Sequence, residues 1–196
     1  MRSTVLLLVI VIFLLACSSP PIPKPSGYFR IDLPQKAYTT FESSCNFSME
    51  VPKYSKVNVF KDRTGSDSCW FNVDFPRFNA SVYCTYFTVN KDVNELVKEA
   101  YQFAAKHELK ATALKRTPID QPQNNVYGIF YDIEGEAASQ VQFFVTDSTA
   151  NFLRGSLYFN NRPNPDSIAP VLDFVREDLL KMANSVKWNI SATRHE

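Results

Sequence analysis

The hydrophobic pattern is clearest between positions 127 and 160, where three runs rich in Ile, Val, Phe, Tyr and Leu alternate with polar turns. The turns read Glu-Gly-Glu at 134–136 and Asp-Ser-Thr at 147–149. Links this short favour antiparallel strands, because a parallel return needs about a dozen residues or more. The pattern therefore predicts a three-stranded antiparallel meander.

Alternation along these strands predicts which side chains share a face. One face collects apolar positions that we expect to be buried: Tyr127, Ile129, Tyr131, Ile133, Val141, Phe143, Val145, Leu153, Leu157 and Phe159. The other face is wetter or is covered by a partner, and it carries the candidate interaction residues Asp132, Gln140, Gln142 and Arg154. These four project to one side only if the strand registers hold, since a slip of one residue reverses a strand's faces. Arg154 is either a snorkelling or surface-paired cation, or a recognition residue.

Shorter apolar runs predict further strands at 27–33, 47–51, 57–60, 69–75, 81–89 and 111–116. Two stretches have helical periodicity. One runs from the N-cap candidate Asp92 to about Leu109. The other starts within 163–167, and its apolar stripe is Ile168, Leu172, Val175, Leu179, Met182 and Val186. The predicted fold is α+β, with an antiparallel β-sheet of about six strands packed by two main helices. We expect one domain over 27–190 and a frayed tail at 191–196.

The first 16 residues have the features of an export signal. Arg2 precedes an apolar run of 12 residues at 5–16, which is too short to span a hydrocarbon core of roughly 30 Å comfortably. The run ends in Leu-Leu-Ala-Cys at 14–17, which resembles the bacterial lipobox and predicts Cys17 as the lipidated mature N-terminus. The alternatives are a plain signal peptide with a chance cysteine, or an uncleaved anchor. Residues 17–26 are then a lipidated cysteine and an extended, proline-rich tether.

Three further cysteines follow Cys17, and an exported domain meets an oxidising compartment in which disulfides persist. Cys45 and Cys69 lie in polar turns, whereas Cys84 lies inside an apolar strand. This placement favours a Cys45–Cys69 disulfide, with Cys84 buried as a small hydrophobic residue. A Cys69–Cys84 pair is the next alternative.

Charge and motifs argue against several classes of function. The chain has 21 basic and 20 acidic residues, so removal of Arg2 with the signal peptide leaves 20 of each and no basic stripe for nucleic acid. We find no hydrolase, zinc-protease or phosphate-loop motif, and we expect neither enzymatic activity nor a cofactor or metal. His107, near a helix end, and His195, in the tail, are the only histidines. His107 suits the helix dipole better than a catalytic role.

Several longer motifs resemble a known family. They are Gly-Tyr-Phe-Arg-Ile-Asp-Leu-Pro at 27–34, Cys-Trp-Phe-Asn-Val-Asp-Phe-Pro at 69–76, Tyr-Asp-Ile-Glu-Gly at 131–135, Val-Gln-Phe-Phe-Val-Thr-Asp-Ser at 141–148 and Phe-Leu-Arg-Gly-Ser-Leu-Tyr-Phe-Asn at 152–160. Together with the lipobox, they resemble the gliding motility lipoprotein family GldD of Bacteroidetes. The order of elements and the Ser-Val-Lys-Trp sequence that ends the domain at 185–188 also resemble the PsbP/Mog1-like fold. A resemblance of fold alone says nothing about activity.

The family resemblance implies a lipid-anchored cell-envelope protein required for gliding motility and the associated type IX secretion apparatus. It implies partners among those machineries and an outer-membrane location facing the periplasm, and it carries over no catalytic residue. We expect an accessory protein that acts by protein–protein interaction. The alternative is a periplasmic lipoprotein that binds a small ligand or a cell-wall fragment. A large apolar cleft with convergent polar groups would favour the ligand, and a flat, aromatic-rich patch would favour the scaffold.

Overall fold

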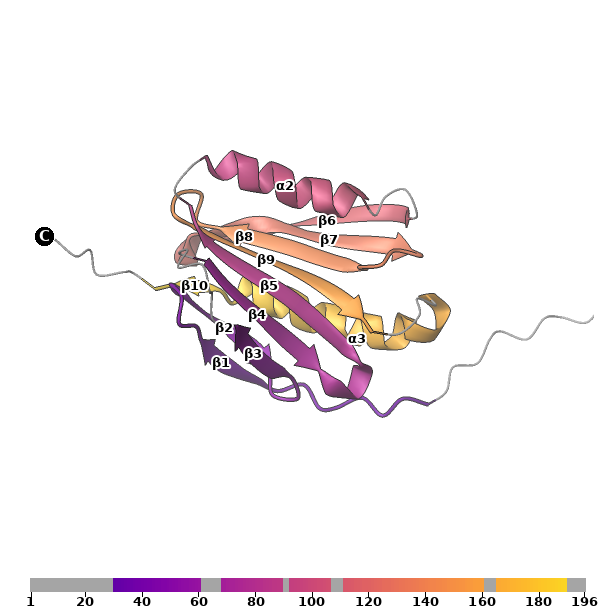
Figure 1. Cartoon of the computed structure of the whole chain (residues 1–196). Coiled ribbons are helices and arrows are strands. Elements are labelled where there is room, and N and C mark those ends of the chain that lie inside the picture. Colours follow the sequence, from indigo (N-terminus) through magenta and orange to yellow (C-terminus); the bar gives the residue numbers. More distant parts are fainter. Residues whose placement is uncertain (1–29, 61–67, 90–91, 107–110, 161–164, 190–196) are drawn as a thin grey trace, which may run out of the picture. The chain divides into compact units, whose positions relative to one another are not determined.

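The computed structural model describes residues 30–60, 68–89, 92–106, 111–160 and 165–189, and within them the chain forms two antiparallel sheets and two α-helices (Figure 1). The larger sheet has seven strands in the order β3-β4-β5-β9-β8-β7-β6. Its strands are β3 (Lys56–Phe60), β4 (Ser68–Phe75), β5 (Ala80–Thr88), β6 (Ala111–Gln121), β7 (Val126–Gly135), β8 (Val141–Thr146) and β9 (Asn151–Phe159). The smaller sheet has the order β1-β2-β10, with β1 (Tyr38–Glu42), β2 (Phe47–Pro52) and β10 (Lys187–Trp188).

The α+β class and the antiparallel meander are confirmed, but the strand count is not. Ten described strands lie in two sheets, where about six strands in one sheet were expected. The second sheet was missed because β1 is mostly exposed and β10 has only two residues, so neither has a strong apolar signal. Residues 30–33 form no strand, and the rest of the strand expected at 27–33 lies outside the described residues.

Strand β6 continues five residues beyond the predicted end, past Pro118. A proline interrupts hydrogen bonding in the middle of a sheet, but β6 is an edge strand with a neighbour on one side only. Two short 3-10 turns, η1 (Pro76–Phe78) and η2 (Pro122–Asn124), join β4 to β5 and β6 to β7. Each ends in an asparagine of positive φ, 48° at Asn79 and 52° at Asn125, a conformation that asparagine tolerates well.

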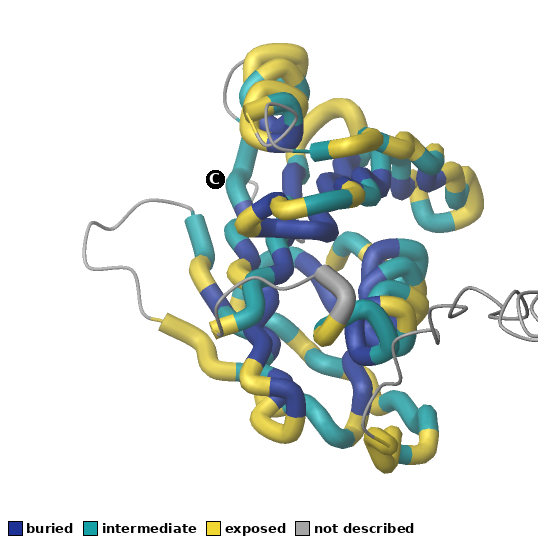
Figure 2. Tube along the Cα trace, turned by 90° about the vertical axis from the view of Figure 1, so that its right-hand side faces the viewer, coloured by how far each residue is buried: buried dark blue, intermediate teal, exposed yellow. Residues whose placement is uncertain are grey.

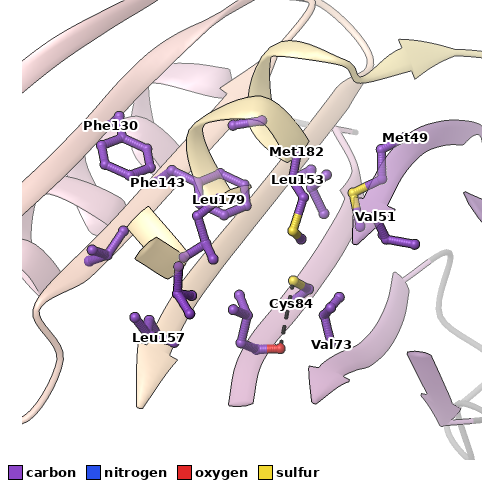
Figure 3. Packing of buried hydrophobic residues seen from close by; sticks show 14 of the residues in the cluster. Met49, Val51, Val73, Cys84, Phe130, Phe143, Leu153, Leu157, Leu179 and Met182 are labelled. Atoms are coloured by element: carbon purple, nitrogen blue, oxygen red, sulfur yellow. Dashed lines mark hydrogen bonds between the residues drawn. The ribbon is translucent and has the colours of Figure 1, made fainter. Parts of the chain in front are cut away.

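The main core lies between the seven-stranded sheet, the three-stranded sheet and helix α3 (Pro165–Asn184). Figure 3 shows Leu179 and Met182 of α3 among Phe143, Leu153 and Leu157 of the sheet. Most of the predicted stripe is buried, since Val175, Leu179 and Met182 of α3 have no exposed surface, and neither has Val186, which follows the end of the helix. The helix thus packs across the sheet, as its periodicity predicted.

Helix α2 (Val93–Lys106) packs on the opposite face of the seven-stranded sheet. Ala100 and Ala104 contact a smaller cluster of Tyr131, Phe144 and Phe152. The carboxylate of Asp92 accepts a hydrogen bond from the backbone N–H of Asn94 at 2.9 Å, which is the predicted N-cap. Figure 2 shows that α2 is exposed along its outer side and buried where it meets the sheet. Both faces of the meander are therefore covered by helices.

A buried carboxylate ties the segment before β1 to α3. Asp178 of α3 has no exposed surface, yet it accepts hydrogen bonds from the hydroxyls of Tyr38, at 2.5 Å, and Tyr54. The ammonium of Lys36 lies 3.2 Å from the same carboxylate and donates to Glu177 at 2.6 Å. This network fixes the beginning of the described chain to its last helix.

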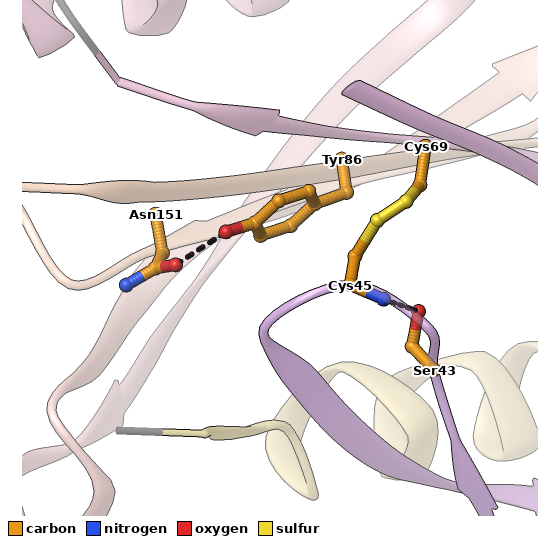
Figure 4. The surroundings of a disulfide bond; sticks show 5 residues. All are labelled: Ser43, Cys45, Cys69, Tyr86 and Asn151. Carbon is orange, nitrogen blue, oxygen red and sulfur yellow. Dashed lines mark hydrogen bonds between the residues drawn. A yellow bond between two sulfur atoms is a disulfide. The ribbon is translucent and has the colours of Figure 1, made fainter. Parts of the chain in front are cut away.

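A disulfide joins Cys45, in the turn between β1 and β2, to Cys69 on β4, with their Cα atoms 6.5 Å apart (Figure 4). It connects the two sheets at one end. Cys84 is a free, buried cysteine on β5, and burial raises the pKa of its thiol well above the ordinary value. Cys84 therefore behaves as a small apolar side chain.

Removing this disulfide is expected to lower the free energy of unfolding by about 3 kcal/mol, because it closes a loop of 24 residues in the unfolded chain. Urea unfolding of a Cys45→Ser, Cys69→Ser double variant measures the loss. Peptide mapping without reductant should recover a Cys45–Cys69 peptide, and a Cys69–Cys84 peptide would contradict the assignment.

Candidate functional site

The strand registers of the meander place the four predicted interaction residues on different faces of the sheet. Directly opposed residues share a face, and Gln142 lies opposite Tyr131 and Ser156, while Arg154 lies opposite Phe144. Gln142 and Arg154 therefore face α2. Asp132 lies opposite Val141, on the α3 face. The expected common face of all four residues is wrong, because β7 is offset by one position from the assumed alternation.

The same offset corrects the predicted buried face. Tyr127, Ile129 and Tyr131 of β7 face α2, whereas Val141, Phe143 and Val145 of β8 and Leu153, Leu157 and Phe159 of β9 face α3. The apolar residues of β7 were thus assigned to the wrong side. Since helices bury both faces, polarity does not separate them as it would in a half-exposed strand.

Asp132 and Gln140 have structural partners. Asp132 forms an ion pair with Arg176 of α3, whose Nε lies 2.9 Å from the carboxylate. The side-chain amide of Gln140 donates to the carbonyl of Ala137 at 2.8 Å and braces the turn before β8. Neither side chain contributes to the surface near α2.

Arg154 lies between the sheet and α2. Its guanidinium is 4.8 Å from the ring centre of Phe103 and 5.5 Å from that of Phe87, distances at which a cation is attracted to an aromatic face. One nitrogen lies 3.4 Å from the carboxylate of Glu99, which is a long contact for a charged pair. The side chain is held in place by the rings, while most of its donors remain available.

A pocket of about 220 Å³ opens beside Arg154. Its wall includes the charged or polar side chains of Arg154, Gln142, Thr85 and Ser156 and the apolar side chains of Ala100 and Phe103. Tyr83, Tyr131 and Tyr158 complete the lining, together with Phe143 and Gly155. The pocket is therefore polar on the sheet side and apolar on the helix side.

Two further polar residues of this wall, Gln142 and Tyr131, are almost wholly buried as residues, but their polar atoms are not among the buried atoms of the described chain that lack a partner. Gln142 is 5% exposed and Tyr131 is 2% exposed. The Gln142 amide and the Tyr131 hydroxyl line the pocket and can donate hydrogen bonds to a ligand or to water there. Burial raises the pKa of Tyr131, and the nearby Arg116 acts in the opposite direction, so this hydroxyl is a neutral donor.

Next to the pocket, part of the sheet lies beyond α2 and exposes aromatic side chains. Phe60 lies directly opposite Trp70, and the rings of Tyr83 and Tyr158 are 5.6 Å apart. With Phe103 of α2, these residues form what we call the aromatic face: Phe60, Trp70, Tyr83, Phe103 and Tyr158. The registers place the four strand residues on the side of the sheet that carries Arg154.

Sequence reasoning did not single out the aromatic face. The available signal was the alternation in β4 and β5, where Trp70 precedes the buried Phe71 and Tyr83 lies between the buried Val82 and Cys84. Among the described residues, no group of three or more His, Cys, Asp or Glu is arranged to hold a metal ion. No helix in the described ranges is both long and apolar enough to cross a bilayer. Cys17 lies outside the described residues.

Comparison with known families identifies the chain. Residues 18–188 match the family model of the gliding motility lipoprotein GldD. The chain belongs to the GldD family. This membership confirms the predicted resemblance and gives the protein a role in gliding motility as a membrane-anchored lipoprotein of the cell envelope.

Other comparisons add little to this GldD-family assignment. The solution structure of cyanobacterial PsbP (CyanoP) from Synechocystis sp. PCC 6803 is similar, with 10% identity, a TM-score of 0.46 and coverage of 86% of this chain and 99% of that one. None of the curated proteins compared with the chain is similar to it. The α+β class rests on the described strands and helices themselves.

Proposed function

We propose that this GldD-family protein is a non-enzymatic accessory of the gliding apparatus and of the associated type IX secretion apparatus, and that it acts by binding other proteins of those machineries. The lipidated Cys17 holds it on the outer membrane, and the tether at 18–26 lets the domain face the periplasm. The membrane and these proteins are its partners, and nucleic acid is not. The docking surface is the aromatic face with Arg154 at its centre.

The observation that carries this proposal is the exposure of large aromatic side chains on one face of neighbouring strands, with Phe60 directly opposite Trp70. Trp70 and Tyr83 are each 47% exposed, and Phe60 is 49% exposed. Contiguous exposed apolar patches on soluble domains are usually binding surfaces. Interface centres are enriched in aromatic residues and arginine, the combination present here. The pocket beside it, at about 220 Å³, is smaller than the roughly 300–1,000 Å³ typical of drug-sized ligands, so the surface rather than the pocket carries the proposed function.

Phe60→Ser is expected to impair gliding while leaving the domain folded, because its half-exposed ring belongs to the proposed surface. Val59→Ser is the matched control, since Val59 is 48% exposed on the same strand but on the other side of the sheet. Gliding speed of cells carrying each variant, together with the thermal unfolding midpoint of each protein, measures the effect. Equal gliding by the two variants, both folded, would contradict the proposed surface.

A further inference from the structure

The pocket beside Arg154 has more donors than its own protein uses. The guanidinium has five N–H donors, and one long contact to Glu99 engages one of its nitrogens. The Gln142 amide and the Tyr131 hydroxyl lie in the same wall, where they can donate as well. A group that only accepts hydrogen bonds would satisfy all three side chains at once.

The single positive charge in the pocket wall favours a ligand with a single negative charge. Arg154 is the one charged side chain that lines the described pocket, since Glu99 stands outside the lining. One cation with several neutral donors suits a single negative charge, and a planar guanidinium matches the two oxygens of a carboxylate. Ala100 and Phe103 offer apolar contact opposite, in a volume of about 220 Å³.

We propose that this pocket binds a carboxylate attached to a short apolar group, such as the last residue of a partner chain or a free organic acid. This inference rests on the proposed function for its biological setting, but its chemistry is independent of it. The carboxylate accepts from Arg154 and Gln142, and the apolar group packs on Phe103 and against the paired rings of Tyr83 and Tyr158.

The carboxylate of Glu99 competes with that ligand for the guanidinium of Arg154. Its side chain is 46% exposed and touches Arg154 at 3.4 Å, so it can turn into water without leaving a buried charge. In the free protein it partly neutralises the guanidinium, and the incoming carboxylate takes its place. Removing the charge of Glu99 should therefore strengthen binding, which a purely structural role of Arg154 would not produce.

The test uses the full chain in lipid nanodiscs, with 3-phenylpropanoate as the probe, its neutral amide as the matched ligand, and calorimetry as the readout. The acid should bind about tenfold or more tightly than the amide, because a hydrogen bond between two charged groups is stronger than one to a neutral acceptor. Arg154→Gln should weaken acid binding by about the same factor. Glu99→Gln should tighten it several-fold, while Lys98→Gln, on the exposed side of α2, should leave it unchanged.

A second arm separates the two sources of the carboxylate. The probe is an acetylated tripeptide that ends in phenylalanine, compared with the same peptide amidated at its C-terminus. Tighter binding of the free-acid peptide than of 3-phenylpropanoate assigns the pocket to a chain end, since the preceding residues then reach the aromatic face. Weaker binding of the peptide assigns the pocket to a free acid.

Equal binding of acid and amide, or unchanged binding in Glu99→Gln, would overturn the proposal. Glu99→Gln keeps the test decisive even if Arg154→Gln fails to fold, because an exposed side chain can be replaced without loss of the core. The proposed function fails separately. If Phe60→Ser impairs gliding but no acid binds, the docking surface is supported and the pocket proposal is wrong. If the acid binds but Phe60→Ser cells glide normally, the pocket proposal is supported and the docking surface is wrong.

Discussion

Replacing Asp178 by alanine is expected to destabilise the domain by about 3–5 kcal/mol, because it leaves buried donors without their acceptor. The hydroxyls of Tyr38 and Tyr54 both donate to this fully buried carboxylate, and Lys36 lies 3.2 Å from it. Without Asp178, the charge of Lys36 keeps the exposed Glu177, the carbonyl of Phe174, which accepts at 3.0 Å, and the face of the Phe174 ring at 4.5 Å. Urea unfolding measures the loss, which is a large fraction of the stability of an ordinary domain.

Glu177→Ala is the matched control for this prediction. Glu177 is the neighbouring residue, and it pairs with the same Lys36 at 2.6 Å, but its side chain is 74% exposed. Exposed ion pairs contribute little, so this variant should unfold at nearly the wild-type urea concentration. If the two variants were equally stable, the Asp178 network would not be what holds the N-terminal segment to α3.

Alkaline titration gives a second readout of the same network. Burial and, next, the hydrogen bonds to Asp178 raise the pKa of Tyr38 and of Tyr54 above their ordinary value of 10.0. A raised folded pKa means that each tyrosine stabilises the fold below the unfolded pKa, and that this contribution is lost as pH rises through the folded pKa. In Asp178→Ala, the remaining folded protein should form tyrosinate at lower pH than the wild type, as measured by ultraviolet absorbance.

The helices were predictable because each has one apolar stripe and one dominant partner surface. The spacing of Val175, Leu179 and Met182 predicted the buried face of α3 correctly. The apolar spacing did not indicate that Asp178, which lies beside Leu179, is equally buried. A charged residue at a stripe position would need partners, but Tyr38 and Tyr54 are distant in sequence and no local pattern indicates them.

The faces of the sheet were harder to predict, for a physical reason. Strand β8 is buried at all six positions, so alternation carries no information about which side chain faces which helix. The register that links Tyr131 to Gln142 follows from the turn before β8, where the N–H of Ile133 donates to the carbonyl of Gln140 at 2.8 Å. This register places Asp132 on the opposite face of the sheet from Gln142 and Arg154.

The candidate site was half predictable. Arg154 and Gln142 stand out as polar residues within apolar strands, and both line the pocket. Alternation places Trp70 and Tyr83 on the face opposite the core positions of β4 and β5, but the sequence does not show whether that face is covered. Their exposure depends on how far α2 extends over the sheet, which is decided by packing between α2 and strands β8 and β9 rather than by local pattern.

Cys17→Ala is expected to release the protein from the membrane and to abolish its support of gliding. The lipobox resemblance predicts several acyl chains on Cys17, and each buried CH₂ contributes about 0.8 kcal/mol, so loss of all the chains removes the anchor entirely. Metabolic labelling with a fatty acid should mark the wild type and leave Cys17→Ala unmarked. Cys84→Ala is the control, because it removes a buried cysteine of the folded domain and should be labelled normally.

One complication of this experiment is that Cys17→Ala also removes the residue at which the signal would be cleaved. An uncleaved apolar run at 5–16 could then hold the chain on the membrane, and the mass of the protein would reveal residues 1–16. A second variant therefore combines Cys17→Ala with a plain secretory signal in place of residues 1–16, which is removed independently of Cys17. If this variant, cleaved and unlabelled, still fractionates with membranes and supports gliding, then lipid on Cys17 is not the anchor, and the domain is held there through contacts of its own.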